Sequence, residues 1–461
     1  MLYINEDKIK SILESAKKAS FTEVNRILEK SKELKRLSLE ETATLLSVED
    51  PKILKDIYKS AAFVKNEIYG KRVVLFAPLY ISNICKNNCV YCAFRADNKT
   101  LERKALTPEE ITKQTELLLK SGHKRVLVVA GEAPPKGKGL VEYYVEAIKA
   151  VYAARYKGHK IKRVNINCAP LTMEEFKQLK AAEIGTFQIF QETYHEETYR
   201  KDHPSGPKSD PDNRIDGVNR AMNAGIDDIG IGVLYGLYDY KWETLAMLMH
   251  VEKMEEMFGV GPHTISVPRI EPADGSEFST NVPNKISDEE FKKIVSVLRL
   301  SVPYTGVVLS TREKADLRDE LVNLGVSQIS AASRTNPGGY DEEENKAGGQ
   351  FEISDERSLD DVLSMLIDKG NIPSFCAACY RKQRTGEAFM GFAKLGTIKG
   401  KCRMNALITL KEYLDDFASE DVKKKGYVLI QKEKAMLDDE SAVLLSKFYE
   451  DIDKGLRDEY V

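Results

Sequence analysis

Eight short runs of mostly apolar residues recur along the middle of the chain, and longer amphipathic stretches separate them. They read RVVLFAPLYIS (72–82), RVLVVAG (125–131), RVNINCA (163–169), TFQIFQET (186–193), DIGIGVLYG (228–236), TISVPRIE (264–271), GVVLST (306–311) and SQISAAS (327–333). Continuous apolar strands that alternate with helices are typical of a parallel sheet covered by helices. Eight of them favour a closed (β/α)8 barrel of the TIM type, and an open doubly wound sheet is the alternative.

Helix-start signals between the runs support this alternation. The tetrapeptides TPEE (107–110), TMEE (172–175) and SDEE (287–290) each place Thr or Ser at a predicted N-cap with Glu three residues later. This is the pattern of a capping box. If the fold is a barrel, its chemistry belongs at the C-terminal ends of the strands.

The chain divides into three predicted regions. Residues 1–70 contain FTEVNRILEKSKELKRLSLEETATLLS, which spaces its apolar residues three or four apart and lacks Gly and Pro, so they predict an N-terminal helical extension. Residues 71–340 form the predicted barrel. The connector TNPGGYDEEENKAGGQF (335–351) leads into residues 341–461, which predict a mostly helical C-terminal domain.

Charge and composition narrow the class of partner. The 461 residues include 69 Lys and Arg against 72 Asp and Glu, for a net charge of -3. Such a balance offers no field for binding nucleic acid or an anionic membrane, so a small-molecule substrate is expected. No segment approaches a membrane span, and the N-terminus carries charges where a signal peptide needs its apolar centre. A soluble, cytoplasmic protein is therefore predicted.

Three of the seven cysteines lie within eight residues, directly after the first predicted strand. Cys85, Cys89 and Cys92 form C-x3-C-x2-C in ISNICKNNCVYCAFR (81–95). A structural zinc site is the simple alternative, but such sites normally close with four ligands, and no His lies between residues 70 and 122. An iron–sulfur cluster held by three thiolates keeps one iron open for a small molecule.

This motif, with the aromatic Tyr91 before its last Cys, resembles the radical S-adenosylmethionine (SAM) superfamily. The resemblance implies a 4Fe-4S cluster that binds the amino acid end of SAM and reduces it to a 5'-deoxyadenosyl radical. It assigns Gly131 and Glu132 of AGE to the SAM amino group, where the superfamily usually has Gly-Gly-Glu. It also assigns Glu192 to the ribose hydroxyls and Arg214 to the methionine carboxylate. An ordinary turn at residues 131–132 and solvated charges at the other two positions are the alternatives.

A second cysteine triad lies in the predicted C-terminal domain. Cys376, Cys379 and Cys402 form C-x2-C-x22-C, and all six His residues lie before residue 264. Zinc is again the alternative, but no local His can complete its coordination. A second iron–sulfur cluster with an open position is therefore predicted.

The two triads together resemble the HydG family, the tyrosine lyases of FeFe-hydrogenase maturation. The resemblance implies that L-tyrosine is cleaved at Cα–Cβ to p-cresol and dehydroglycine. Dehydroglycine then gives carbon monoxide and cyanide at the C-terminal cluster, and these leave on iron as an Fe(CO)(CN) precursor of the H-cluster. It also implies a reduced ferredoxin- or flavodoxin-type electron donor and other hydrogenase maturation proteins as partners.

The same resemblance suggests further site residues. His263 becomes a candidate ligand for an additional labile iron beside the C-terminal 4Fe-4S cluster, although it precedes a strand. Arg312 is expected to bind the tyrosine carboxylate, because a planar guanidinium grips it through two hydrogen bonds, and Ser330 could add a third. Arg269 and Arg334 are competitors for this role.

Two other functions stay open on the sequence alone. The tyrosine lyase of thiamine biosynthesis (2-iminoacetate synthase) shares QETYH and LSTRE with this chain but lacks the second triad. A non-enzymatic iron–sulfur scaffold would need neither a barrel nor Arg312. The remaining cysteine, Cys168, has apolar neighbours and predicts a buried core thiol.

Overall fold

A computed structural model describes the chain except for residues 342–347, 383 and 395–397. Eight parallel strands follow one another around a closed barrel, because β1 pairs with both β8 and β2. This confirms the (β/α)8 barrel over the open sheet. The strands are β1 (Arg72–Ser82), β2 (Arg125–Ala130), β3 (Arg163–Asn167), β4 (Phe187–Glu192), β5 (Ile229–Val233), β6 (Thr264–Ser266), β7 (Gly306–Leu309) and β8 (Gln328–Ser330).

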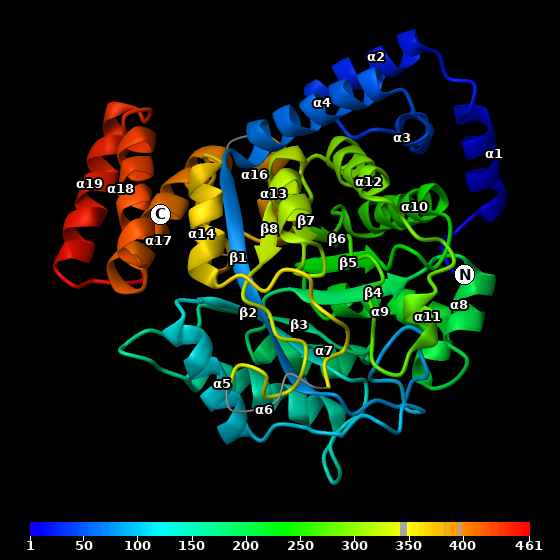
Figure 1. Cartoon of the computed structure of the whole chain (residues 1–461), viewed down its shortest axis with the longest axis horizontal. Coiled ribbons are helices and arrows are strands. Elements are labelled where there is room, and N and C mark those ends of the chain that lie inside the picture. Colours follow the sequence, from blue (N-terminus) through cyan, green and yellow to red (C-terminus); the bar gives the residue numbers. More distant parts are fainter. Residues whose placement is uncertain (342–347, 383, 395–397) are drawn as a thin grey trace.

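Helices cover the outside of the barrel (Figure 1). They are α5 (Pro108–Lys120), α6 (Leu140–Ala153), α7 (Met173–Ala181), α8 (Glu196–Asp202), α9 (Pro211–Asn223), α10 (Tyr240–Phe258), α11 (Glu277–Thr280), α12 (Asp288–Ser301) and α13 (Ala315–Leu324), with the short 3-10 helix η1 (Pro207–Ser209). The three predicted capping boxes are present at α5, α7 and α12. Each box satisfies two backbone donors, so these helix starts are fixed locally by the sequence.

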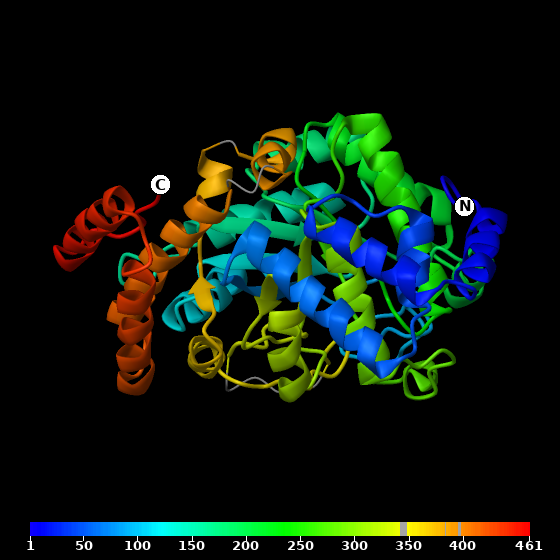
Figure 2. The same ribbon diagram turned by 90° about the horizontal axis from the view of Figure 1, so that it is seen from above.

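The N-terminal extension consists of α1 (Glu6–Ala16), α2 (Phe21–Lys32), α3 (Leu39–Leu46) and α4 (Pro51–Tyr69). Their buried apolar residues, among them Ile27 and Ile57, belong to the same hydrophobic core as the barrel. The helices lie over one side of the barrel, and the two chain ends lie far apart in both views (Figures 1 and 2).

The C-terminal region is helical, as expected, but it also adds a strand. Its helices are α14 (Leu359–Asp368), α15 (Ala378–Arg381), α16 (Gly386–Lys394), α17 (Ile398–Asp416), α18 (Glu420–Lys434) and α19 (Asp439–Asp453). The added strand β9 (Ile372–Ser374) pairs with Arg72–Val74 at the start of β1, whereas β2 pairs with β1 from Ala77 onward. β9 therefore lies next to the N-terminal end of β2. The division at residues 70 and 340 stays a prediction.

The length of β1 separates the two cysteine triads. The strand has 11 residues, against three to six in the other strands, and at about 3.3 Å per residue it runs roughly 33 Å from end to end. The first cysteine triad lies after its C-terminal end, and β9, which leads into the second triad, lies at its N-terminal end. Among the described residues, no helix is both long and apolar enough to cross a membrane.

Candidate functional site

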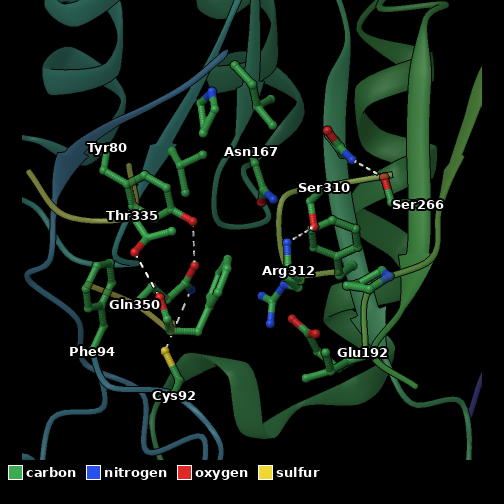
Figure 3. A pocket seen from close by; sticks show the side chains of 18 of the residues that line it. Tyr80, Cys92, Phe94, Asn167, Glu192, Ser266, Ser310, Arg312, Thr335 and Gln350 are labelled. Atoms are coloured by element: carbon green, nitrogen blue, oxygen red, sulfur yellow. Dashed lines mark hydrogen bonds between the residues drawn. The ribbon is translucent and has the colours of Figure 1, made fainter. Parts of the chain in front are cut away.

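A cavity opens at the C-terminal ends of the barrel strands. The loop with the first three cysteines forms one wall, and the ends of β2, β4, β6, β7 and β8 form the others. Figure 3 shows Cys92 on one side of this upper cavity, with Glu192 and Arg312 on the other. The structure thus brings together ten of the predicted site residues: Cys85, Cys89, Tyr91, Cys92, Gly131, Glu132, Glu192, Arg214, Arg312 and Ser330.

The three thiols of the first triad border this cavity. Burial raises the pKa of Cys89 to about 12 and that of Cys92 to about 11, and it also raises the pKa of Cys85. Free thiols here are therefore protonated near neutral pH, and a bound metal is what would make them thiolates. Three thiols beside open space fit a cubane cluster with one iron left for another ligand.

Gly131 allows the cysteine loop to approach β2 closely. A Cβ at this position would lie 2.3 Å from the carbonyl oxygen of Ile84, which precedes Cys85. The Gly131 N–H donates to the Ser82 carbonyl at 2.8 Å. Ala130 has no positive φ, so Ala in place of the usual first Gly is tolerated. The AGE segment thus packs closely against the cysteine loop, and its assignment to the SAM amino group stays a prediction.

Four charged side chains, three of them buried, form a network beside the cysteine loop. Arg214 donates to Glu132 at 2.9 Å, and Lys208 donates to Glu192 at 2.6 Å. Burial would raise the pKa of Glu132, but Arg214 and Lys208 outweigh it, so the pKa lies below its ordinary value. Glu132 is therefore half-buried and Glu192 buried, both are ionically paired, and Arg214 is not a solvated surface charge.

Glu192 occupies a strained position at the end of β4. Its φ is 71°, and the pairing of β4 with β5 shifts register between Phe190 and Glu192. Non-glycine residues in this region cost of order 1–3 kcal/mol and cluster at functional sites. The irregularity directs the carboxylate into the cavity, where Lys208 meets it.

The hydroxyl of Tyr91 is hydrogen-bonded to His203. Its hydroxyl lies 2.8 Å from Nε2 of His203, whose Nδ1 lies 2.8 Å from the Tyr199 carbonyl. A carbonyl can only accept, so Nδ1 carries the proton and Nε2 accepts from the Tyr91 hydroxyl. Burial and the nearby Lys208 lower the pKa of His203 well below its ordinary value, which keeps the ring neutral.

Arg312 comes after β7 and lies in the cavity with its guanidinium stacked on Phe351, 3.2 Å from the ring centroid. Within the described part of the chain it forms no ion pair. Its competitor Arg269 is paired with Glu313, and neither Arg269 nor Arg334 lines this cavity. Ser330 lies on β8 with its hydroxyl toward the cavity, where it accepts from the Thr311 N–H at 3.2 Å.

A second cavity lies at the opposite, N-terminal end of the barrel. It contains Cys376 after β9, Cys379 on α15, Cys402 on α17 and His263 just before β6. Burial raises the pKa of Cys379 to about 12 and also raises that of Cys376. Nδ1 of His263 is buried without a partner among the described residues. These four side chains share one cavity and are of types that ligate metals. His263 precedes β6 because this lower cavity lies at the N-terminal ends of the strands.

Comparison with known proteins agrees with this geometry. Residues 79–251 match the model of the Radical SAM superfamily, and residues 266–372 match that of the Biotin and Thiamin Synthesis associated domain. A crystal structure of HydG, a maturase of the [FeFe]-hydrogenase, is 48% identical, with a TM-score of 0.96 and 100% coverage of both chains. The chain belongs to the HydG family. HydG from Carboxydothermus hydrogenoformans is 41% identical, with a TM-score of 0.83 over 96% of this chain and 97% of that one.

The HydG family shares its superfamily with enzymes of other pathways. The 2-iminoacetate synthase of Salmonella typhimurium is 30% identical over 73% of this chain and 86% of its own length. Membership of the radical SAM superfamily implies a 4Fe-4S cluster and SAM. The individual residues that bind them, and the second cluster, remain proposals.

Several residues of this HydG-family site carry no sequence signal. Asn87 donates to Glu132 at 2.8 Å and accepts from the Lys208 N–H at 2.9 Å, so it joins the cysteine loop to the charge network. Gln350 donates to Sγ of Cys92 at 3.7 Å and accepts from the Tyr80 hydroxyl (Figure 3). Glu271 lines the cavity, where burial raises its pKa to about 7. Cys168 is buried in the core, as predicted.

Proposed function

We propose that the protein is a radical SAM tyrosine lyase of FeFe-hydrogenase maturation. It cleaves L-tyrosine to p-cresol and dehydroglycine in the upper cavity and converts dehydroglycine to carbon monoxide and cyanide in the lower one. Neutral dehydroglycine has the atoms of one hydrogen cyanide, one carbon monoxide and one water, so this second step needs no external oxidant. The product is an Fe(CO)(CN) precursor of the H-cluster.

The charge network of the upper cavity suits the amino acid end of SAM. Glu132 and Arg214 now pair with each other, and an ammonium and a carboxylate can enter between them with each charge meeting its opposite. Glu192 presents a carboxylate to the ribose hydroxyls, and Lys208 holds it in place. When bound, the cluster and SAM supply the 5'-deoxyadenosyl radical.

Arg312 and Ser330 are the proposed residues for tyrosine. Arg312 is half-buried and has no carboxylate partner in the described residues, and only its Nη1 donates, to the Arg269 carbonyl at 3.3 Å. It can therefore still offer donors to the substrate carboxylate. The stacked Phe351 fixes the plane of the guanidinium and excludes water on one side. With the carboxylate held, loss of a hydrogen from the amino group leads to cleavage of Cα–Cβ, and the two-carbon fragment keeps its carboxylate. Glu271 is placed to exchange a proton in this cavity.

The lower cavity would hold the second 4Fe-4S cluster through Cys376, Cys379 and Cys402. His263 has a neutral ring because burial lowers its pKa, and its partnerless Nδ1 suits it to ligate an additional iron. A reduced ferredoxin- or flavodoxin-type donor and other hydrogenase maturation proteins would complete the system.

One observation carries the proposal: three cysteines of residues 376–402 and the distant His263 converge on a second cavity at the opposite end of β1 from the first triad. A 2-iminoacetate synthase needs only the first site. An iron–sulfur scaffold needs neither the four-charge network nor an Arg312 without an ion-pair partner in the described residues.

The test uses anaerobically reconstituted protein with SAM, dithionite and L-tyrosine. We expect p-cresol and 5'-deoxyadenosine, detected by chromatography, and carbon monoxide, trapped by deoxyhaemoglobin. The variant Cys376→Ala/Cys379→Ala should still form p-cresol but no carbon monoxide, and Cys168→Ala serves as its matched control. Absence of p-cresol from the wild-type protein would support a scaffold, and p-cresol without carbon monoxide would support the thiamine-pathway lyase.

A further inference from the structure

The first three strands of the barrel begin with the same tripeptide. Lys-Arg-Val occurs at residues 71–73, 124–126 and 162–164, and its arginine is the first residue of β1, β2 and β3. We call Arg72, Arg125 and Arg163 the strand-start arginines. Parallel strands place their first residues at the same end of a barrel, so the repeat directs three guanidinium groups to the N-terminal end.

Two of the strand-start arginines line the lower cavity, and the third packs against one of its lining residues. Arg125 and Arg163 are opposite each other in the pairing of β2 with β3, and Arg72 is opposite Ile372 of β9. Arg72 and Arg125 both line the cavity, and Nη1 of Arg125 donates to the Cys376 carbonyl at 2.7 Å. Arg163 stacks on Tyr380, another lining residue, at 2.9 Å from the ring centroid.

These arginines have unused donors. Within the described residues, the Nε atom of each of the three arginines is buried and has no hydrogen-bond partner. Water can hardly supply one, because Arg125 and Arg163 are only 7% exposed. An Nε without a partner is not by itself a sign of a ligand, because the buried Arg318 also has one while its Nη atoms donate to Asp355 and to the Ser330 carbonyl. Arg299 shows a structural guanidinium whose donors are all used. Arg299 donates from Nε to Gly325 at 3.0 Å and from Nη1 to the carbonyls of Pro303 and Thr305, each at 2.7 Å. A buried donor without a partner destabilises the fold, and no side-chain nitrogen of Arg72 donates to any described residue, so its donors point to a ligand.

The charges of the cavity lead to the same conclusion. Asp228 is the only carboxylate among its lining residues in the described structure, and it pairs with Arg163 at 3.7 Å. Across the described parts of the chain, neither Arg72 nor Arg125 forms an ion pair with a carboxylate. A 4Fe-4S core of charge +2 on three thiolates carries about one negative charge. Arg384 and Lys401 line the cavity as well as Arg72 and Arg125, so positive charge remains for a further anion.

We infer that Arg72 and Arg125 bind the carboxylate of a small α-imino or α-oxo acid in the lower cavity. This inference rests on the proposed function, because it assigns these arginines to the two-carbon product of the upper cavity. The guanidinium groups hold the carboxylate through charge-assisted hydrogen bonds, and Arg163 holds Asp228 and Tyr380 at the edge of the site. A neutral diatomic molecule would satisfy neither the charge nor the forked donors.

The experiment measures binding of glyoxylate, a stable α-oxo acid of two carbons, to reconstituted protein by equilibrium dialysis without SAM or reductant. All proteins carry Arg312→Gln, so that the carboxylate site of the upper cavity is not counted. We expect Arg72→Gln and Arg125→Gln each to weaken binding by roughly tenfold or more, since one charge-assisted hydrogen bond is lost. Arg72→Lys keeps the positive charge but loses the two parallel donors of the guanidinium. Its glyoxylate affinity should lie between that of the Gln variants and that of the parent protein.

Iron content and thermal unfolding identify variants that fail to fold, and Arg26→Gln, an exposed arginine on α2, is the matched control. Equal glyoxylate affinity in folded Arg72→Gln and in the parent would overturn the inference. So would loss of iron from the second site with unchanged glyoxylate affinity, because the arginines would then serve only the cluster. Formation of p-cresol by the wild-type protein tests the proposed function separately.

Discussion

Replacing Gly131 by Ala tests whether the close approach of β2 to the cysteine loop matters. The added Cβ would lie 2.3 Å from the Ile84 carbonyl oxygen, and an ordinary contact begins at 3.4 Å. The loop must therefore move by about 1 Å. The neighbour is backbone and leads directly into Cys85, so a rotamer change cannot relieve the clash. Overpacking of this kind costs about 1–3 kcal/mol.

The larger effect should fall on the chemistry. A displacement of about 1 Å in a reacting geometry costs on the order of 10²-fold in rate. We expect Gly131→Ala to form 5'-deoxyadenosine roughly a hundred times more slowly, measured by chromatography after single-turnover reduction. The matched control is Gly391→Ala on α16, where a Cβ meets no atom within 4 Å; it should be as active as the wild-type protein.

Iron content separates the two causes of a slow variant. If Gly131→Ala binds a full cluster and still reacts slowly, the geometry of SAM binding is disturbed. If it forms 5'-deoxyadenosine at the wild-type rate, the cysteine loop does not depend on this contact and the reasoning from the Ile84 carbonyl is wrong.

Three further predictions concern the upper cavity. Burial raises the pKa of Glu271 to about 7, so p-cresol formation should increase with pH through about 7 as this carboxyl ionises. Glu271→Gln should remove that pH dependence. The contribution of Glu271 to the free energy of unfolding should decrease as the pH rises towards 7, because the folded state holds this proton more tightly than the unfolded state does. Arg312→Lys should raise KM for tyrosine by roughly tenfold, since one of two hydrogen bonds to the carboxylate is lost, and an unchanged KM would assign the substrate carboxylate elsewhere. Lys208→Met leaves Glu192 without its 2.6 Å partner, and chemical denaturation should show a loss of about 3 kcal/mol.

The sequence predicted the beginnings of the strands better than their ends. The run at 72–82 coincides with β1, but the run at 264–271 extends well past β6, which is Thr264–Ser266. Val267, Pro268, Ile270 and Glu271 line the upper cavity instead. Apolar residues serve a cavity wall and a sheet equally well, so hydrophobicity alone does not mark where pairing stops.

β9 could not be predicted from local pattern. It has three residues with Pro373 at its centre, and Pro lacks the N–H that a central strand needs. The strand forms because the start of β1 extends beyond the reach of β2 and leaves an edge to pair. Lys208 was missed for a similar reason, since only the folded loop before α9 brings it to Glu192.

The cysteine spacings, in contrast, were enough to predict which cysteines share each cavity. Each triad lies on one or two short segments, so its convergence is decided by local chain geometry. His263 reaches the second triad only through the barrel, and its assignment came from resemblance to a family.

Both cavities depend on the residue register of the single strand β1. Its side chains alternate in direction, so loss of one residue from the middle of the strand would reverse the inward and outward faces of everything beyond it. The segment that leads to Cys85 would then be out of phase with the one that carries Arg72. The loops at either end of β1 can therefore change in length independently, but the strand itself does not tolerate the insertion or deletion of a single residue.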